Sequence, residues 1–408
     1  MKEWKEYKLG DLIVLSSGGT PNKSNSSFWD GDIPWISAKS MYDDYLYSSD
    51  MTITKEGLNN GSKLAPVNSI LLLTRGSGLF NRIPVCLVKR EMAFNQDVKC
   101  IESINEDIVS NLFLFYWLIG NKQEISNILE TTGIGAGKID TERLKNIPIN
   151  LPPIQKQQVL IKFAESLMLK IEVNRRINDN LEQQAQALFK SWFVDFEPFK
   201  DQPFVESELG LIPQGWKVGT FLENINVMPG GTPSTSVESF WKDGVIPFFS
   251  PKDVKGVYCF ETEKSITEDG LNNCSSHLYP KDTLFITARG TVGKITLAGC
   301  PMAMNQSNYA LVAKTGIGKY YLYLLTQTLV NVLLKKANGA VFSAISTRDF
   351  NEPTIMPPLK ELERFEDLAK PIFDKIYQIS RESRRLAELR DTLLPHLMSG
   401  KININEIN

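Results

Sequence analysis

The chain has 408 residues, too many for one compact core, and this length predicts two or more domains. With 42% hydrophobic and 23% charged residues, the composition is ordinary for a globular protein, and no apolar run is long enough to span a membrane. The net charge of −2 argues against a simple nucleic-acid binder, and five scattered cysteines with only two histidines argue against a zinc site. Scattered thiols of this kind are typical of the reducing cytoplasm, where we expect the protein to be found.

The first 150 or so residues mix short strand signals with Gly, Pro and Asn turns. The apolar run 69–74 predicts a buried strand, and residues 111–129 predict an apolar-faced helix. An α+β globular unit is therefore expected. The Gly-rich segment 132–138 is similar to a phosphate-binding loop, but its glycines enclose three residues where four are required, so we interpret it as a turn.

A long helix is predicted over 154–189, a stretch that follows two prolines and contains neither Gly nor Pro. It would be about 54 Å long, much longer than an average globular helix. Its apolar residues recur at three- and four-residue steps, which is typical of a coiled-coil seam, and Asn174 and Asn178 interrupt that seam. The alternative is that the helix packs on its own globular unit.

After a proline-containing linker predicted over 197–214, the chain repeats itself. The repeat includes a buried strand at 283–287, a helix at 319–336 and a second long helix at 359–398. Phe365 and Leu368 are expected in the second seam, and Pro371 is expected to kink this helix or delay its start. The recurring motifs are Gly18-Gly19-Thr20-Pro21 as Gly230-Gly231-Thr232-Pro233, Phe28-Trp29 as Phe240-Trp241, Arg75-Gly76 as Arg289-Gly290, and Asn95-Gln96 as Asn305-Gln306.

Polar residues that occur in both repeats are the best candidates for a binding site. Arginine can form two hydrogen bonds with guanine, glutamine can do so with adenine, and lysine suits phosphate. We found no catalytic constellation and no metal-ligand set in the sequence. The candidate DNA-binding residues are Lys39, Arg75, Gly76, Gln96, Lys252, Arg289, Gly290 and Gln306.

An alternative interpretation is that repeated residues maintain the shared fold. This interpretation is favoured for Gly76, Gly290, Asn95 and Asn305. Residues shared by both repeats also cannot explain different base preferences. Such differences must come from segments that diverge, which are 42–49 against 255–261 and 78–90 against 292–301.

The whole chain resembles the specificity (S) subunits of type I restriction–modification systems. The resemblance rests on the opening motifs of both repeats and on three further segments. These segments are Leu209-Gly210-x-Ile212-Pro213-x-Gly215-Trp216, the run from Ala187 to Phe196, and the run from Leu389 to Gly400.

The resemblance implies two α+β target recognition domains, related by a pseudo-twofold and separated by an antiparallel coiled coil of the two long helices. It assigns 1–152 and 201–357 to the recognition domains, and 153–200 and 358–408 to the helical spacers. Each domain would recognise one half of a split site in double-stranded DNA. Two modification (methyltransferase) subunits would dock on the helices and use S-adenosylmethionine, and restriction (nuclease/translocase) subunits would join them. The chain itself would hold no cofactor and catalyse nothing.

Two other interpretations remain open on sequence alone. A self-contained methyltransferase or nuclease would transfer methyl groups or cleave DNA without partners. An orphan pseudo-dimeric DNA-binding regulator would be recovered from its host without a methyltransferase subunit.

Overall fold

The computed structural model describes residues 4–133, 135–336 and 344–402. The chain divides into two compact units, each with an α+β globular part and one portion of each long helix. Unit 1 comprises Met1–Ile171 and Arg385–Asn408, and unit 2 comprises Glu172–Arg384. This confirms the α+β class with long helices. The predicted division into two recognition domains and two helical spacers has other boundaries than these two units, and it stays a prediction.

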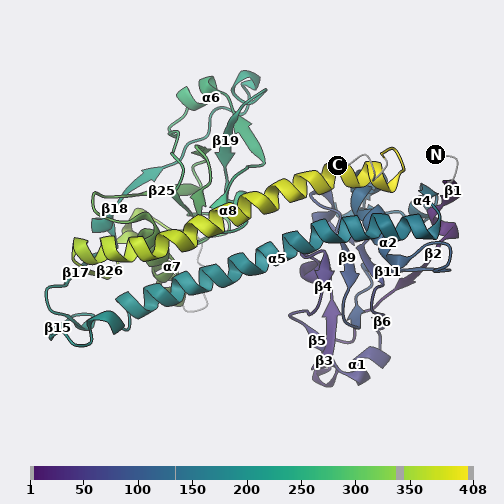
Figure 1. Ribbon diagram of the computed structural model, residues 1–408, viewed down its shortest axis with the longest axis horizontal. Coiled ribbons are helices and arrows are strands. Elements are labelled where there is room, and N and C mark those ends of the chain that lie inside the picture. Colours follow the sequence, from purple (N-terminus) through teal and green to yellow (C-terminus); the bar gives the residue numbers. More distant parts are fainter. Residues whose placement is uncertain (1–3, 134, 337–343, 403–408) are drawn as a thin grey trace. The chain divides into compact units, whose positions relative to one another are not determined.

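Unit 1 is built on a five-stranded sheet with the order β2-β11-β7-β9-β4 (Figure 1). The central strand β7, Ile70–Leu73, is buried and pairs antiparallel with both neighbours, which confirms the strand predicted at 69–74. The helix α2, Asn111–Gly120, packs against β9 and β11. The other strands are β2 (Ile13–Ser17), β4 (Tyr45–Leu46), β9 (Val85–Val88) and β11 (Val98–Ser103).

The helix predicted over 111–129 is shorter than expected. It ends at Gly120, a short helix α3 spans Lys122–Ser126, and strand β12 begins at Leu129. A Cβ on Gly120 would lie 3.2 Å from backbone atoms of Leu394 and Pro395 in the second long helix. The glycine therefore allows a close approach between helices, which apolar periodicity alone does not indicate.

Smaller sheets complete unit 1. One has the order β5-β3-β10-β6, and another joins β12, β13 and β8. A further pair joins β1 to β14. In the sequence, the short helix α1 (Lys55–Asn59) lies between β5 and β6, and the short helix α4 (Thr141–Lys145) lies between β13 and β14. The strands are β1 (Lys5–Lys8), β3 (Trp29–Ile36), β5 (Thr52–Ile53), β6 (Lys63–Ala65), β8 (Arg75–Gly76), β10 (Met92–Phe94), β12 (Leu129–Thr131), β13 (Gly137–Ile139) and β14 (Pro148–Leu151).

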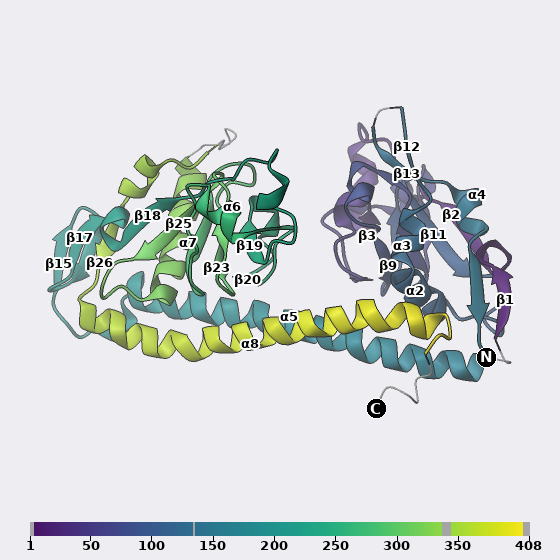
Figure 2. The same cartoon turned by 90° about the horizontal axis from the view of Figure 1, so that it is seen from above.

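Unit 2 repeats this plan (Figure 2). Its five-stranded sheet has the order β18-β25-β22-β23-β20, and its second sheet has the order β21-β19-β24. Helix α7, Lys319–Lys336, matches the predicted helix, and α6 spans Glu268–Asn272. The strands of these sheets are β18 (Ile225–Pro229), β19 (Ile246–Phe249), β20 (Tyr258–Cys259), β21 (Lys264–Ile266), β22 (Leu284–Thr287), β23 (Ile295–Ala298), β24 (Ala303–Met304) and β25 (Asn308–Ala313).

The two long helices are α5, Ile154–Phe193, and α8, Leu359–Met398. The buried Gln157 fixes the start of α5, because its Nε2 donates to the carbonyl oxygens of Ile108 at 2.8 Å and Pro152 at 3.0 Å. Helix α8 is continuous through Pro371, so the expectation that it starts late is wrong. Pro371 lies on the exposed face, where a missing backbone N–H is tolerated more easily.

Within unit 2 the two helices run antiparallel. Asn174 Nδ2 donates to Glu382 Oε2 at 2.8 Å, and Asn178 Nδ2 donates to Ser380 Oγ at 3.0 Å. In unit 1, apolar residues of both helices join the core of the globular part, including Leu160 of α5 and Leu397 of α8. The helices therefore pair with each other and also pack on the globular parts, so the two alternatives are not exclusive.

Asn174 is a polar residue buried in this seam. It is only 1% exposed, and its Oδ1 has no hydrogen-bond partner among the described residues. We expect Asn174→Leu to raise the free energy of unfolding of unit 2 by about 1 kcal/mol, because a buried polar seam residue fixes register at a cost in stability. Chemical denaturation checks this. A lower stability would show that the bond to Glu382 outweighs the buried carbonyl.

The segment predicted as a linker, 197–214, is folded in unit 2. It contains the hairpin of β15 (Phe204–Ser207) and β16 (Gly210–Pro213), followed by β17 (Lys217–Thr220), which pairs with β26 (Pro353–Met356). Phe199 is buried, and its ring centroid lies 5.7 Å from that of Trp192 and 4.9 Å from that of Trp216. The end of α5 is thus joined to the rest of unit 2 by aromatic packing.

Glu366 of α8 caps the first turn of α7. Its two carboxylate oxygens accept the backbone N–H groups of Tyr320 at 3.1 Å and Tyr321 at 3.2 Å. Burial raises the pKa of this carboxyl group, and the two N–H groups act in the opposite direction. The contact joins the long helix to the helix that covers the sheet, since the first N–H groups of a helix have no partner within it.

We expect Glu366→Ala to lower the free energy of unfolding of unit 2 by about 1–2 kcal/mol, the usual cost of removing a helix cap. Denaturant titration followed by circular dichroism measures the change. Glu363→Ala on the exposed face of the same helix is the matched control and should have little effect. Equal effects of the two substitutions would contradict the capping role.

Among the described residues, no helix combines the length and the apolar character that crossing a membrane requires.

Candidate nucleic-acid interface

In unit 1, three of the predicted site residues follow the ends of strands from two neighbouring sheets. Strands β3 and β10 are parallel, and Asn95 N donates to Ile36 O at 2.9 Å just beyond them. Lys39 and Gln96 follow these two ends. Thr74 N donates to Asp97 O at 2.8 Å, which brings the end of β7 to the same place. Arg75 therefore lies beside the segment that carries Gln96.

Unit 2 places the equivalent residues in the same way. Strands β19 and β24 are parallel, and Lys252 and Gln306 follow their ends. Arg289 N donates to Ser307 O at 3.1 Å, so the arginine again lies beside the glutamine segment. A Cβ on Gly290 would lie 4.0 Å from Pro251 Cβ, so the loop that carries Arg289 lies beside the loop that carries Lys252. We call each of these two sets of loops a strand-end cluster.

The cations of these clusters are accessible. Lys39, Arg75, Lys252 and Arg289 are all exposed. Lys252 forms an ion pair with Glu263 at 3.8 Å, and both side chains are largely exposed, so the pair is weak. Within the described residues, Arg75 and Arg289 form no ion pair. Their guanidinium groups are therefore available to an external acceptor such as a phosphate or a guanine edge.

The two glutamines are partly engaged in holding the fold. Thr20 Oγ1 donates to Gln96 Oε1 at 2.7 Å, and Thr232 Oγ1 donates to Gln306 Oε1 in the same way. These bonds connect the Gly-Gly-Thr-Pro motif to the Asn-Gln motif in both units. Each glutamine still presents an exposed amide, so base contact stays a prediction.

The recurring glycines and asparagines have conformational roles. Gly290 has φ +82°, a left-handed conformation that favours glycine. Asn95 Oδ1 accepts from Asp97 N at 3.1 Å, and Asn305 Oδ1 accepts from Ser307 N at 3.0 Å, so each asparagine closes its own turn. Gly76 lies opposite Gly137 in the pairing of β8 with β13. These contacts favour fold maintenance as their role.

Lys138 is a further candidate, in a segment that the sequence interpretation assigned to a turn, and the structure places it in strand β13. Strand β13 pairs antiparallel with β8, and Lys138 lies directly opposite Arg75. Opposite residues of an antiparallel pair project on the same face, so Arg75 and Lys138 are adjacent cations there, and Glu130 of β12 lies opposite Lys138 on its other side. The proximity of Lys138 to Arg75 depends on the pairing of strands that are distant in sequence, so the sequence alone does not indicate it. Ile134 of the same Gly-rich segment lies outside the described residues.

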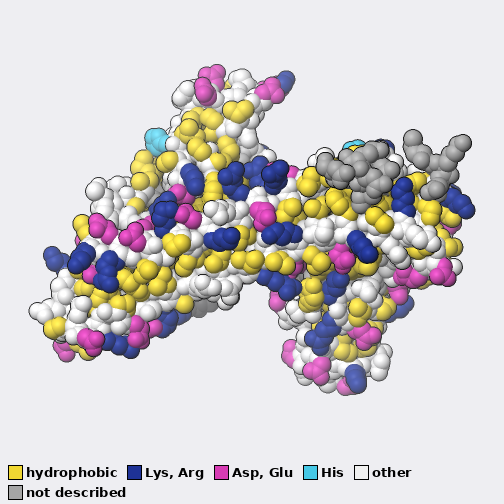
Figure 3. Space-filling view, in the orientation of Figure 1, with side chains coloured by type: hydrophobic (Ala, Val, Ile, Leu, Met, Phe, Trp, Pro, Cys, Tyr) yellow, Lys and Arg dark blue, Asp and Glu magenta, His cyan; other side chains and the backbone are white. Residues whose placement is uncertain are grey.

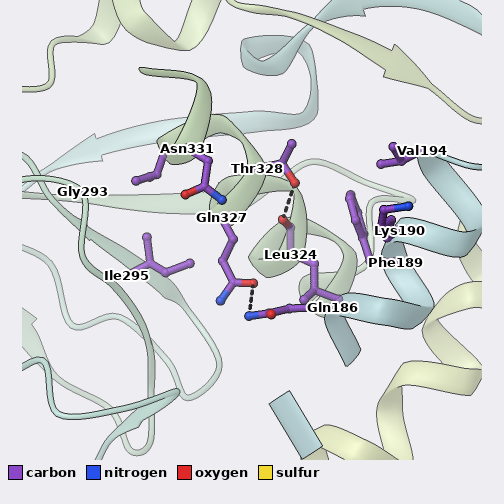
Figure 4. Close-up of a pocket in the computed structure, with 11 residues that line it drawn as sticks. Gln186, Phe189, Lys190, Val194, Gly293, Ile295, Leu324, Gln327, Thr328 and Asn331 are labelled. Carbon is purple, nitrogen blue, oxygen red and sulfur yellow. Dashed lines mark hydrogen bonds between the residues drawn. The ribbon is translucent and has the colours of Figure 1, made fainter. Parts of the chain in front are cut away.

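Unit 2 also contains a surface cavity of about 530 Å³ (Figure 4). Side chains from α5, from α7 and from the β22–β23 hairpin line it, and Gln186 Nε2 donates to Gln327 Oε1 at 3.4 Å across it. Lys190 is its ionisable lining residue, and it forms an ion pair with Asp195 at 2.5 Å. This lining offers neither a nucleophile with a base nor a pair of carboxylates, so it suggests no reaction.

Charge on the face drawn in Figure 3 is mixed, with acidic and basic side chains interspersed and several cations along the long helices. Among the residues that the structure describes, no group of three or more His, Cys, Asp and Glu could hold a metal ion. The observations so far favour binding of an anionic polymer by a few local cations in each unit.

Comparisons with known proteins identify the family. A model described as "Type I restriction modification DNA specificity domain" matches residues 1–183 and 213–389. The MjaIX specificity subunit of a type I restriction enzyme from Methanocaldococcus jannaschii is 29% identical over 100% of this chain and 95% of its own length. The HindI specificity subunit from Haemophilus influenzae is 25% identical over 98% of this chain and 100% of its own length.

A solved structure supports the fold. The S subunit of a type I restriction-modification system from M. genitalium is 17% identical, with a TM-score of 0.51, and the match covers 97% of this chain and 96% of that chain. The repeated α+β plan, the two long helices and the family model agree. The chain therefore belongs to the type I restriction–modification specificity subunits, the non-catalytic members of these systems that recognise DNA.

Proposed function

We propose that the chain recognises a bipartite site in double-stranded DNA, with each unit binding one half-site through its strand-end cluster. One observation carries this proposal: an arginine, a glutamine and a lysine occupy equivalent strand ends in both units of a specificity subunit. Two equivalent clusters suit two half-sites better than one continuous site.

The long helices fit a role in spacing. Each has 40 residues, or about 60 Å at 1.5 Å per residue. Half-sites one DNA turn apart are separated by roughly 34 Å. Helices of this length are sufficient to carry two binding parts that contact half-sites a turn apart, with unread bases between them.

The helices are also the proposed docking surface for methyltransferase subunits, with nuclease/translocase subunits joining for restriction. Val173 and Ile177 lie four residues apart on the part of α5 that belongs to unit 2, and they are 48% and 39% exposed. This spacing places them on one face of the helix, and exposed apolar side chains in a row suit a protein partner. The partners would bind S-adenosylmethionine and supply further positive surface to the DNA. We place the assembly in the cytoplasm, which is consistent with five free thiols in the chain.

Methylome sequencing tests the proposal. The host, compared with a strain lacking this gene, should show a bipartite adenine-modified motif that disappears with the gene. A pull-down of the chain should recover a methyltransferase subunit. A motif that persists without the gene, or recovery of the chain without any methyltransferase, would favour the orphan DNA-binding regulator instead.

A further inference from the structure

We propose that Tyr42 and Phe80 recognise thymine methyl groups in the half-site bound by unit 1, and that unit 2 has no equivalent contact. This inference rests on the proposed function and adds to it the source of different preferences in the two half-sites. Both aromatic residues lie in the divergent segments 42–49 and 78–90.

The two aromatic side chains are unusually exposed, with Tyr42 at 72% and Phe80 at 51%. Each one directly follows a buried anchor in the sequence. Met41 precedes Tyr42, Leu79 precedes Phe80, and both anchors are 1% exposed. Because the anchors hold their loops against the core, the aromatic side chains are directed outward by the same local conformation.

Arg82 joins the two loops. Its Nη1 donates to Tyr42 O at 2.9 Å, and its Nη2 donates to Met41 O. Its own backbone N donates to Gly78 O at 3.1 Å, within the turn that carries Phe80. One residue, through its side chain and its backbone N–H, thus fixes both loops, which lowers the entropy lost when the aromatic residues bind a partner.

The aromatic pair adjoins the cations of the strand-end cluster. A Cβ on Gly137 would lie 3.5 Å from Phe80 Cε2, and Gly137 precedes Lys138, the residue opposite Arg75. Tyr42 follows Lys39 by three residues on the adjoining loop. Positive charge beside apolar rings suits duplex DNA, where phosphates flank the bases and thymine presents an apolar methyl group in the major groove.

Unit 2 differs at the corresponding loops. The segment that replaces 42–49 begins at Lys255, and the segment that replaces 78–90 begins at Val292, which packs against the core. In these two segments, 255–261 and 292–301, which the structure describes in full, the aromatic residues Tyr258 and Phe260 pack against the core and no large apolar side chain is exposed. The contact should therefore affect one half-site only.

The test uses the chain in complex with its methyltransferase subunits and duplexes that carry the motif from the methylome. Thymines are replaced by deoxyuridine, which lacks the methyl group, in one half-site at a time. For the wild-type complex we expect about a fourfold loss of affinity per contacted methyl group, in one half-site only, from burial of one carbon. The Tyr42→Ala/Phe80→Ala variant should bind more weakly and should lose this dependence on thymine.

Ile104→Ala is the matched control, because Ile104 is another exposed apolar residue of unit 1, at 56%. This variant should keep the thymine dependence of the wild type. Three results would overturn this inference without affecting the proposed function. They are unchanged affinity of the wild-type complex after deoxyuridine substitution, an equal loss of affinity in both half-sites, and a double variant that depends on thymine as strongly as the wild type. Absence of any specific DNA binding by the complex would overturn the proposed function as well.

Discussion

Replacing Phe365 with alanine is expected to lower the free energy of unfolding of unit 2 by about 3–5 kcal/mol. Phe365 is fully buried in α8, where that helix meets α5 and α7. Removing the ring leaves a cavity among large rings that cannot collapse easily. The neighbouring rings, by centroid distance from Phe365, are Phe193 at 4.9 Å, Trp192 at 5.9 Å, Phe189 at 6.1 Å and Tyr321 at 6.3 Å.

Denaturant titration followed by tryptophan fluorescence measures this change, because Trp192 and Trp216 both lie in the affected core. Leu368→Ala is the matched control. Leu368 lies one turn further along α8 and is 49% exposed, so its replacement should change the stability by about 0.5 kcal/mol or less. If the two substitutions have similar effects, the aromatic cluster is not what holds the long helices to the globular part of unit 2.

Phe365 and Leu368 also show what sequence periodicity can predict about a helix and what it cannot. Both were expected in the helix seam, and the structure buries Phe365 and exposes Leu368. Helix α8 itself was predicted with the bounds observed, because forty residues with an apolar repeat give a strong local signal. Which apolar residue faces the partner depends on the neighbouring surface, and that surface is formed by residues distant in sequence.

Strands and loops show the same limit. The buried strand β7 was predicted because an apolar run between turn residues is a local signal. The pairing of β8 with β13, which brings Lys138 opposite Arg75, joins residues more than sixty positions apart and has no local signal. The hairpin after α5 was missed because its prolines indicate a linker, whereas Pro213 lies at the end of β16.

For the candidate site, the internal repeat supplied the residues but not their roles. A residue that recurs can serve the fold or the ligand, and the sequence does not separate these alternatives. The structure gives Gln96 a bond to Thr20 and leaves the Arg75 side chain without an ion pair within the described residues. Arg75 and its counterpart are therefore the sharper test of DNA recognition.

Arg75→Ala and Arg289→Ala are each expected to weaken specific DNA binding by about 1–3 kcal/mol, or roughly 5- to 150-fold. Each substitution should relax discrimination in one half-site and leave the other unchanged, because the two arginines belong to different units. We would measure binding of the methyltransferase complex, at fixed salt, to the cognate duplex and to duplexes mismatched in one half-site. These measurements give the loss of affinity and the loss of discrimination in each half-site. Unchanged discrimination would remove that arginine from the site.

Lysine at the same positions separates a base contact from a phosphate contact. A guanidinium can form two parallel hydrogen bonds with guanine O6 and N7, and its planar geometry differs from that of an ammonium group. If Arg75 contacts a base, Arg75→Lys should lose most of the discrimination and keep the salt dependence. If it contacts only phosphate, lysine should restore binding, and Arg75→Ala should weaken all duplexes equally while lowering the salt slope by about one unit. Lys145→Ala, which removes an exposed cation already paired with Glu142 at 2.9 Å, should change neither quantity.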